Sequence, residues 1–188
     1  MTDAHMHIRL READDIPVLA GALLRQQAET RYPFRDPLPI PVEDFLHAGD
    51  AVKGWIAELD DQPVGHVCRT TAVRGFREAG LVNEICARAY GCQSSELTWV
   101  SALFVAAEAR GLGLGRQLMR VVVDDARSCG LHLCLEVLPN HPAAMSLYAA
   151  TGWQTVHRLR PEWLRAAAGD EPPDVHVMVH RPAGSGDR

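Results

Sequence analysis

The stretch that decides the fold is Arg110-Gly111-Leu112-Gly113-Leu114-Gly115-Arg116, in which single residues separate three glycines. An apolar run precedes it at 99–105, and an amphipathic run follows it as far as Cys129. This order indicates a strand, a glycine-rich turn and a helix. A turn of this kind leaves backbone N–H groups at the helix N-terminus, where the helix dipole adds partial positive charge. The sequence therefore predicts a phosphate-binding turn.

Two well-known phosphate-binding motifs do not fit this turn. The loop of nucleotide hydrolases has four residues between its glycines and then Lys and Ser or Thr, whereas the lysine of this chain is Lys53. The dinucleotide fingerprint has the spacing G-x-G-x-x-G after the first strand, whereas the spacing here is G-x-G-x-G, deep in the chain. What remains is R-x-x-G-x-G, formed by Arg110, Gly113 and Gly115. From the turn alone, an ordinary glycine-rich turn without a ligand stays open as an alternative.

A second block follows the amphipathic run. Residues 131–137 alternate between apolar and other side chains and are bounded by Gly130 and Pro139, which predicts a strand. Asn140 or His141 can then cap a helix that begins at Pro142. This helix contains Leu147 and Tyr148, and Gly152 and Trp153 follow it.

Together the two blocks resemble the GNAT acyltransferase superfamily. The turn is similar to its coenzyme A pyrophosphate turn, Q/R-x-x-G-x-G/A, and the second block is similar to its signature ending in L-Y-x-x-x-G-F. The resemblance covers residues 55–153 well. It implies an α/β (α+β) fold with a mixed, mostly antiparallel sheet of about six to seven strands and helices on both faces. It also implies an N-acetyltransferase with acetyl-CoA as cosubstrate.

The length of 188 residues, 47% of them hydrophobic, predicts one domain with a sizeable core. We expect this domain to span 1–181 and a flexible tail to span 182–188. Residues 75–96 predict a helical insertion with apolar spacing at Leu81, Ile85 and Ala89. The remaining pattern predicts strands at 7–12, 53–58, 63–73 and 175–180, a helix at 42–48 and a loop at 32–41. It also predicts a helix that is capped by Asp14 or Asp15 and runs to about Glu29.

Composition excludes several classes of function. A net charge of −5 argues against a nucleic-acid partner. The five cysteines form no C-x-x-C and the histidines have no metal-ligand spacing, so we expect free thiols and no metal site. No apolar stretch approaches membrane-spanning length and residues 1–10 lack a signal-peptide core, so we expect a cytoplasmic protein without membrane association.

The resemblance implies how the cosubstrate binds. Gly113 and Gly115 let the backbone approach the pyrophosphate, and Arg110 or Arg116 adds charge. The amides of the whole turn donate to the phosphates, and these belong to Gly111, Leu112, Gly113, Leu114, Gly115 and Arg116. Upstream, the backbone of Phe104 and Val105 pairs with the pantetheine arm in the manner of an added strand.

One amide near Phe104 and Val105 also stabilises the oxyanion that forms on the thioester. After the second strand, Asn140 or His141 contacts the pantetheine.

The resemblance also implies catalytic roles. Tyr148 is the general acid that protonates the departing thiolate, and the alternative is an aromatic residue packed on the sheet. Glu136 is a candidate general base, and the alternative is a strand carboxylate that faces water or braces the next loop. Many relatives carry a base where this chain has Ser101, so Glu84 or Glu96 acting through water stays open.

The acceptor is a primary amine, either on a small molecule or on a protein. Carboxylates at Asp36, Glu43 and Asp44 could favour a cationic amine, although a solvated acidic loop is the simpler interpretation. A non-catalytic acyl-CoA-binding sensor or scaffold of the same fold is the competing class. Relatives are often dimers, so a homodimer is a further expectation.

Overall fold

The computed structural model describes residues 5–71, 77–168 and 173–181. Contacts divide the chain into two compact units. The first unit comprises Met1–Thr70 with Val100–Asp124, and the second comprises Thr71–Trp99 with Asp125–Arg188. Each unit is built from segments far apart in sequence, and the strand and helix around the glycine turn pass from one unit into the other.

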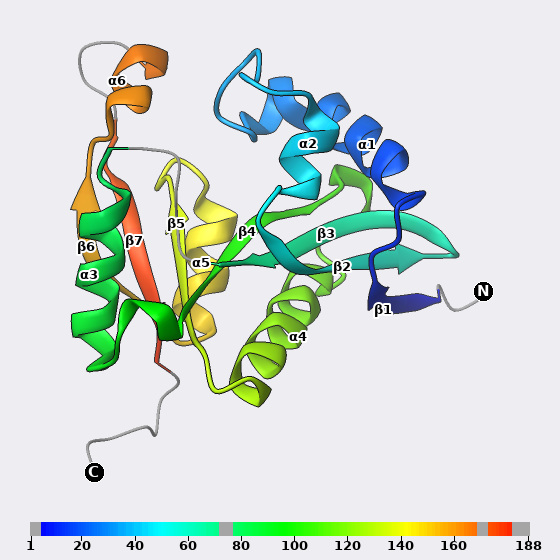
Figure 1. The fold of residues 1–188 in the computed structure, drawn as a ribbon. Helices are drawn as coiled ribbons and strands as arrows, with labels where there is room; N and C mark the ends of the chain where they lie inside the picture. Colours follow the sequence, from blue (N-terminus) through cyan, green and yellow to red (C-terminus); the bar gives the residue numbers. More distant parts are fainter. Residues whose placement is uncertain (1–4, 72–76, 169–172, 182–188) are drawn as a thin grey trace. The chain divides into compact units, whose positions relative to one another are not determined.

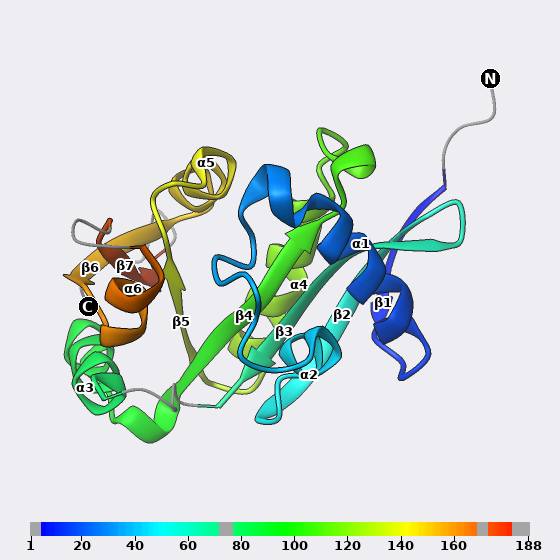
Figure 2. The same cartoon turned by 90° about the horizontal axis from the view of Figure 1, so that it is seen from above.

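The first unit contains three antiparallel strands and the end of a fourth. Strand β1 (Met6–Leu10) pairs with β2 (Ala51–Leu59), and β2 pairs with β3 (Gln62–Thr70). Helices α1 (Asp15–Thr30) and α2 (Val42–His47) lie on one face of β2 and β3, and α4 (Leu114–Ser128) lies on the other (Figures 1 and 2). Buried side chains recur at Ile16, Leu19 and Leu23, which is the spacing of a helix packed along one stripe.

The second unit contains the start of β4 and three further strands. The first residues of β4 (Leu97–Val105) pair in parallel with β5 (His132–Val137), and β7 (Val175–His180) pairs antiparallel with both β5 and β6 (Trp153–Leu159). Helices α3 (Ala79–Tyr90) and α5 (Pro142–Ala150) lie on opposite faces of β6 and β7 (Figures 1 and 2). Two shorter elements complete the unit, η1 (Ser94–Glu96) and α6 (Glu162–Ala168).

The seven strands have the order β1-β2-β3-β4-β5-β7-β6. The pairing of β4 with β5 is parallel and the other registered pairings are antiparallel, so the predicted mixed, mostly antiparallel sheet is confirmed. The strand that leads into the glycine turn is also the strand shared by both units.

The helix predicted at 75–96 is present as α3, but the apolar residues of the predicted spacing are not its most buried ones. Leu81 is exposed, whereas Val82 and Cys86 are fully buried against β5 and β7. The buried stripe also includes Asn83, whose side chain accepts a hydrogen bond from Trp99 Nε1 at 3.1 Å. A polar side chain is therefore buried at a position where the periodicity of apolar residues does not predict burial. The structure adds β6 and α6, which were not predicted, and residues 75–76 and the tail 182–188 lie outside the described residues.

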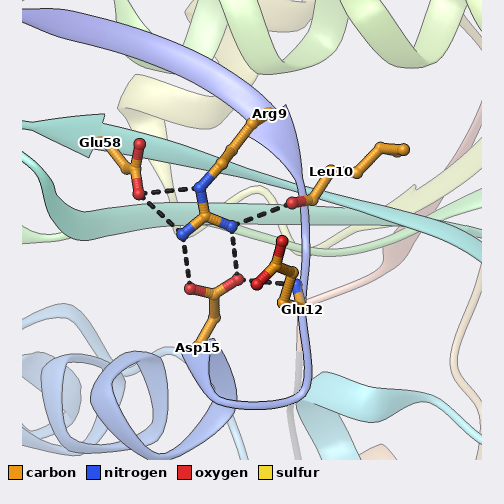
Figure 3. Close-up of polar contacts among 5 residues, drawn as sticks. All are labelled: Arg9, Leu10, Glu12, Asp15 and Glu58. Carbon is orange, nitrogen blue, oxygen red and sulfur yellow. Dashed lines mark hydrogen bonds and ion pairs between the residues drawn. The ribbon is translucent and has the colours of Figure 1, made fainter.

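A partly buried ion pair fixes the start of α1 (Figure 3). The guanidinium of Arg9 donates to both carboxylate oxygens of Asp15 at 2.8 Å, and its Nε donates to Glu58 at 2.8 Å. The Asp15 carboxylate also accepts the Glu12 N–H at 2.7 Å. Asp14 occupies the N-cap position without a side-chain cap, so the predicted capping role is wrong for Asp14. These contacts join β1, β2 and the first turn of α1.

We expect Asp15→Asn to lower the free energy of unfolding at neutral pH by about 1.5–3 kcal/mol, the worth of a hydrogen bond to a charged group. Burial raises the pKa of Asp15, but the hydrogen bonds from Arg9 and Glu12 outweigh it and hold the pKa below its usual value. The contribution is therefore fully present above the unfolded pKa of about 3.9 and is lost as pH falls through the lower folded value.

Urea unfolding between pH 3 and pH 7 measures this contribution in the wild type, in Asp15→Asn and in the control Asp14→Asn. The pH range extends from about one unit below to about three units above the unfolded pKa. Asp14 is exposed, so its variant should follow the wild type. A wild type whose stability falls no more steeply than that of Asp15→Asn on acidification would contradict the assignment.

Candidate active site

The glycine turn has the predicted strand–turn–helix context. Strand β4 ends at Val105, the short helix η2 (Ala107–Ala109) follows, and α4 begins at Leu114. Gly111 and Gly113 have φ values of 81° and 82°, in the left-handed region that favours glycine. No described protein atom lies within 4 Å of the place where a Cβ would stand at either glycine. The glycines are therefore required by the backbone conformation, and the surface above them is open.

The turn presents amides that the protein does not use. The amides of Arg116 and Gln117 donate to the Gly113 carbonyl at 3.1 Å, which closes the first helical turn. Within the described residues, no turn, loop or cap hydrogen bond between backbone groups uses the amides from Gly111 to Gly115. A helix N-terminus with such amides has the geometry of an anion site. The Arg116 amide, expected to donate to the phosphates, is therefore already bonded to the Gly113 carbonyl, which leaves the Arg116 side chain as the group that could meet an anion.

The two arginines of the motif have different surroundings. Arg110 donates through Nε to the Val105 carbonyl at 3.2 Å and through Nη2 to Gln26 Oε1 at 2.7 Å. Gln26 is a buried residue of α1, so Arg110 ties the turn to the end of β4 and to α1. Arg116 is exposed on the first turn of α4. Of the two side chains, Arg116 is the one placed to meet an anion.

Strand β4 is irregular before the turn. Ala102 has a φ of 50°, an unusual value for a non-glycine residue inside a strand. Phe104 is buried and Val105 is half-buried, and their backbone is the segment expected to bind a pantetheine arm. Buried side chains of β3, His66 and Cys68, reach the carbonyls of Ala102 and Ser101. The sequence analysis missed both residues, because nothing in a lone His or Cys of a strand signals such a contact.

Tyr148 lies in the second unit, on α5. Its ring is buried and packs edge-on against Trp153, with the ring centroids 6.0 Å apart. No hydrogen bond to its hydroxyl is found among the described residues. Burial raises the pKa of Tyr148 above its usual value, so the phenol keeps its proton at neutral pH. The residue thus packs on the sheet and also carries a hydroxyl that can still donate.

Glu136 lies on β5, opposite Val177 of β7. It is exposed between the buried residues Leu135 and Val137, and by alternation it shares the face of Cys134, which packs with α3. Although solvent reaches the side chain, the surrounding protein displaces much of the hydrating water and raises the pKa of Glu136 to about 7. Glu136 and Tyr148 therefore belong to opposite faces of this part of the sheet, since α5 covers the other face (Figures 1 and 2).

The other predicted candidates lie on the surface. Glu84 forms an ion pair with Arg88 at 3.7 Å, and the Glu96 carboxylate accepts the Gln93 N–H at 2.7 Å. Both carboxylates are thus engaged within their own local segments. The exposed set also includes Asn140 and the three acidic residues expected on the acceptor side, Asp36, Glu43 and Asp44.

The capping predicted for α5 is only partly present. His141 occupies the N-cap position without a side-chain cap, Pro142 begins the helix as predicted, and Gly152 follows it with a φ of 86°. Asn140 precedes the N-cap residue.

The described residues offer no sign of a metal site or of a membrane-spanning helix. No group of three or more His, Cys, Asp or Glu side chains among them could hold a metal ion. No helix in the described part of the chain is both long and apolar enough to cross a membrane. The five cysteines are free thiols, of which Cys68, Cys86 and Cys134 are buried.

Comparison with known families agrees with this geometry. The family model described as Acetyltransferase (GNAT) family matches residues 22–153, which is more than half of the chain. The chain therefore belongs to the GNAT family of acetyltransferases. No curated protein matches its sequence.

Solved structures share the fold at low sequence identity. One is a putative acetyltransferase from Salmonella typhimurium with its cofactor acetyl-CoA, with a TM-score of 0.68, 16% identity and coverage of 97% of this chain and 96% of that chain. Another is the ribosomal-protein-S18-alanine N-acetyltransferase from Escherichia coli, with a TM-score of 0.65, 16% identity and 98% coverage of both chains. A spermidine N-acetyltransferase chimera from Vibrio cholerae and a second enzyme has a TM-score of 0.60, 18% identity and coverage of 93% and 94%.

Proposed function

We propose that this chain transfers an acetyl group from acetyl-CoA to a primary amine by direct attack of the amine on the thioester. The observation that carries the proposal is the turn at 110–116, where two glycines with positive φ leave backbone amides open at the start of α4. Membership of the GNAT family and the fold shared with an acetyltransferase that holds acetyl-CoA support it.

The binding part of the proposal lies in the first unit. The amides of Gly111, Leu112, Gly113, Leu114 and Gly115 donate to the pyrophosphate, and the Arg116 side chain adds charge.

Arg110 holds the binding turn through Gln26 and the Val105 carbonyl. The backbone from Leu103 to Val105 pairs with the pantetheine arm, as expected for Phe104 and Val105, and one of its amides meets the thioester oxygen.

The catalytic part of the proposal uses two residues of the second unit. Tyr148 donates a proton to the departing thiolate, and its unbonded hydroxyl, which keeps its proton at neutral pH, supports this role. Glu136 accepts the proton of the amine through a water relay, since it lies on the other face of the sheet from Tyr148. A carboxyl with a pKa of about 7 is matched to proton transfer near neutral pH. Asn140 precedes α5 and contacts the pantetheine.

The acceptor in this proposal is a primary amine that is cationic in solution and attacks the thioester after it has lost its proton. Two similar structures are named for different acceptors, a ribosomal-protein alanine in one and spermidine in the other. For this chain we retain both classes, a small-molecule amine and a protein amino group. The exposed carboxylates Asp36, Glu43 and Asp44 support attraction of a positively charged acceptor.

Coenzyme A should stabilise the wild type, by about 2.7 kcal/mol at one hundred times its dissociation constant. Arg116→Ala should weaken binding about 10- to 100-fold, which corresponds to the loss of one charge-assisted hydrogen bond. Urea unfolding with and without coenzyme A measures the first effect, and titration calorimetry measures the second.

The matched control for Arg116→Ala is Arg120→Ala, which makes the same charge change one turn further along α4 at an exposed residue. Equal losses in the two variants would indicate general attraction and count against a site at the helix N-terminus. Failure of coenzyme A to bind the wild type would remove the proposed function.

Tyr148→Phe should lower kcat by about 10²–10⁴-fold with a competent amine, because the thiolate loses its proton donor. Affinity for coenzyme A and the melting temperature should change little, since the ring still packs on Trp153. Stopped-flow detection of released thiol with a panel of amines measures the rate. An unchanged kcat would leave Tyr148 with a packing role alone.

Glu136→Gln should flatten the acidic limb of the kcat/KM profile around pH 7, where the wild-type carboxyl of pKa about 7 gains its base form. The rate should recover partly at high pH, where more of the amine is already deprotonated. The raised pKa also means that ionised Glu136 costs folding stability above its unfolded pKa, so the neutral glutamine should melt no lower at pH 8, about four units above that value. A wild-type profile in Glu136→Gln would show that another group accepts the proton.

A further inference from the structure

Two neighbouring carbonyls of β4 are bonded by side chains of β3. His66 Nδ1 lies 2.9 Å from the Ala102 oxygen, and Cys68 Sγ lies 3.5 Å from the Ser101 oxygen. His66 and Cys68 are two residues apart on β3, so their side chains leave the strand on the same face. The irregular backbone at Ala102, with its φ of 50°, brings both carbonyls to that face. These side chains supply donors that a regular strand would obtain from its ladder.

Arg11 determines which nitrogen of His66 carries the proton. Arg11 Nη1 lies 3.0 Å from His66 Nε2, and a guanidinium can only donate, so Nε2 accepts and Nδ1 bears the hydrogen. His66 is fully buried, and this burial lowers its pKa to about 4, which keeps the ring neutral. A neutral ring of this tautomer is the form that can accept from Arg11 and donate to Ala102.

Arg11 is itself held in place by backbone groups. Its Nη1 donates to the Leu46 carbonyl at 2.6 Å, and its own amide donates to the Gly54 carbonyl at 2.9 Å. A Cβ at Gly54 would lie 3.0 Å from Arg11 Cζ, so the glycine makes room for the guanidinium. A continuous series of contacts therefore runs from Arg11 through His66 to Ala102, within the first unit.

The Ala102 carbonyl and the Leu103 amide belong to one planar peptide group. Because the carbonyl points toward His66, the Leu103 N–H points away from it. The same reasoning applies to the Ser101 carbonyl and the Ala102 N–H. The bend therefore directs two successive amides away from the β3 side chains, whereas successive amides of a regular strand alternate in direction.

We propose that His66, oriented by Arg11, is a positioning residue that aims the Leu103 amide at the thioester oxygen of the acyl donor. The proposal rests on the proposed function, because it assumes that this part of β4 binds the thioester. A single well-aimed donor to a developing oxyanion is worth about 10²-fold in kcat or more. Removing the hydrogen bond from His66 to Ala102 should therefore lower kcat without weakening binding of coenzyme A.

The test compares two amides at residue 66. Asparagine places its side-chain nitrogen near the site of Nδ1, so His66→Asn can still donate to Ala102 but loses the contact with Arg11. Glutamine places its side-chain amide near the site of Nε2, so His66→Gln can still accept from Arg11 but loses the donor to Ala102. The readout is the carbonyl ¹³C chemical shift of bound acetyl-CoA labelled at the thioester carbon, which needs no acceptor amine.

The wild type should shift the carbonyl resonance downfield of free acetyl-CoA, and His66→Gln should lose most of that shift while its dissociation constant for coenzyme A stays within about threefold. His66→Asn should keep the downfield shift of the wild type, because its side-chain amide can still donate to Ala102. A full shift in His66→Gln, or equal losses in both variants, would overturn the proposal. A wild type that binds acetyl-CoA without a shift would also overturn it, whereas a wild type that does not bind acetyl-CoA would instead remove the proposed function.

A second variant keeps the test decisive if His66→Gln does not fold. Gly54→Ala should displace the Arg11 side chain by a few tenths of an ångström, given the 3.0 Å approach, and should reduce the carbonyl shift in part. The control is Gly49→Ala, where no described atom lies within 4 Å of an added Cβ. In that case a Gly54→Ala spectrum equal to that of the wild type would overturn the proposal.

Discussion

Backbone hydrogen bonding in β4 is the constraint on which the rest of the structure depends, because this strand passes through both units and leads into the glycine turn. Where its backbone bends at Ala102, the carbonyls must find donors away from the regular ladder. His66 supplies one donor, and Arg11 fixes the tautomer that allows it. Under our proposal, a buried histidine that does not itself touch the substrate determines the direction of the amide that binds the thioester oxygen.

At the glycine turn, the two arginines of the motif have different surroundings. Arg110 is bound to Gln26 and to the Val105 carbonyl, and so it connects the turn with α1 and β4. Arg116 stands exposed on the first turn of α4. A motif with two cations therefore divides into one that shapes the site and one that can meet the ligand. Gly111 and Gly113 have positive φ values, and the backbone amides from Gly111 to Gly115 have no backbone partner among the turn, loop and cap hydrogen bonds of the described residues.

Sequence predicted what depends on local pattern and missed what depends on distant contacts. The strand–turn–helix around Gly113, the helix from Pro142 and the strand 175–180 follow from periodicity and from turn residues, and the structure contains them. In α3, Leu81 of the predicted apolar spacing is exposed, and the polar residue Asn83 is buried and accepts a hydrogen bond from Trp99, which periodicity cannot show. His66 and Arg11 are 55 residues apart, and no spacing rule connects them with Ala102. The partial loss of hydrating water that raises the pKa of Glu136 is likewise a property of the folded chain.

The central claim is that the turn from Gly111 to Gly115 is a preformed cradle for the pyrophosphate of coenzyme A. Amide ¹H–¹⁵N spectra of the assigned protein, recorded during titration with coenzyme A, test it most directly. The account predicts downfield amide-proton shifts confined mainly to Gly111–Gly115, since these N–H groups would gain an anionic acceptor. Saturable binding of coenzyme A that leaves these five resonances in place would contradict it.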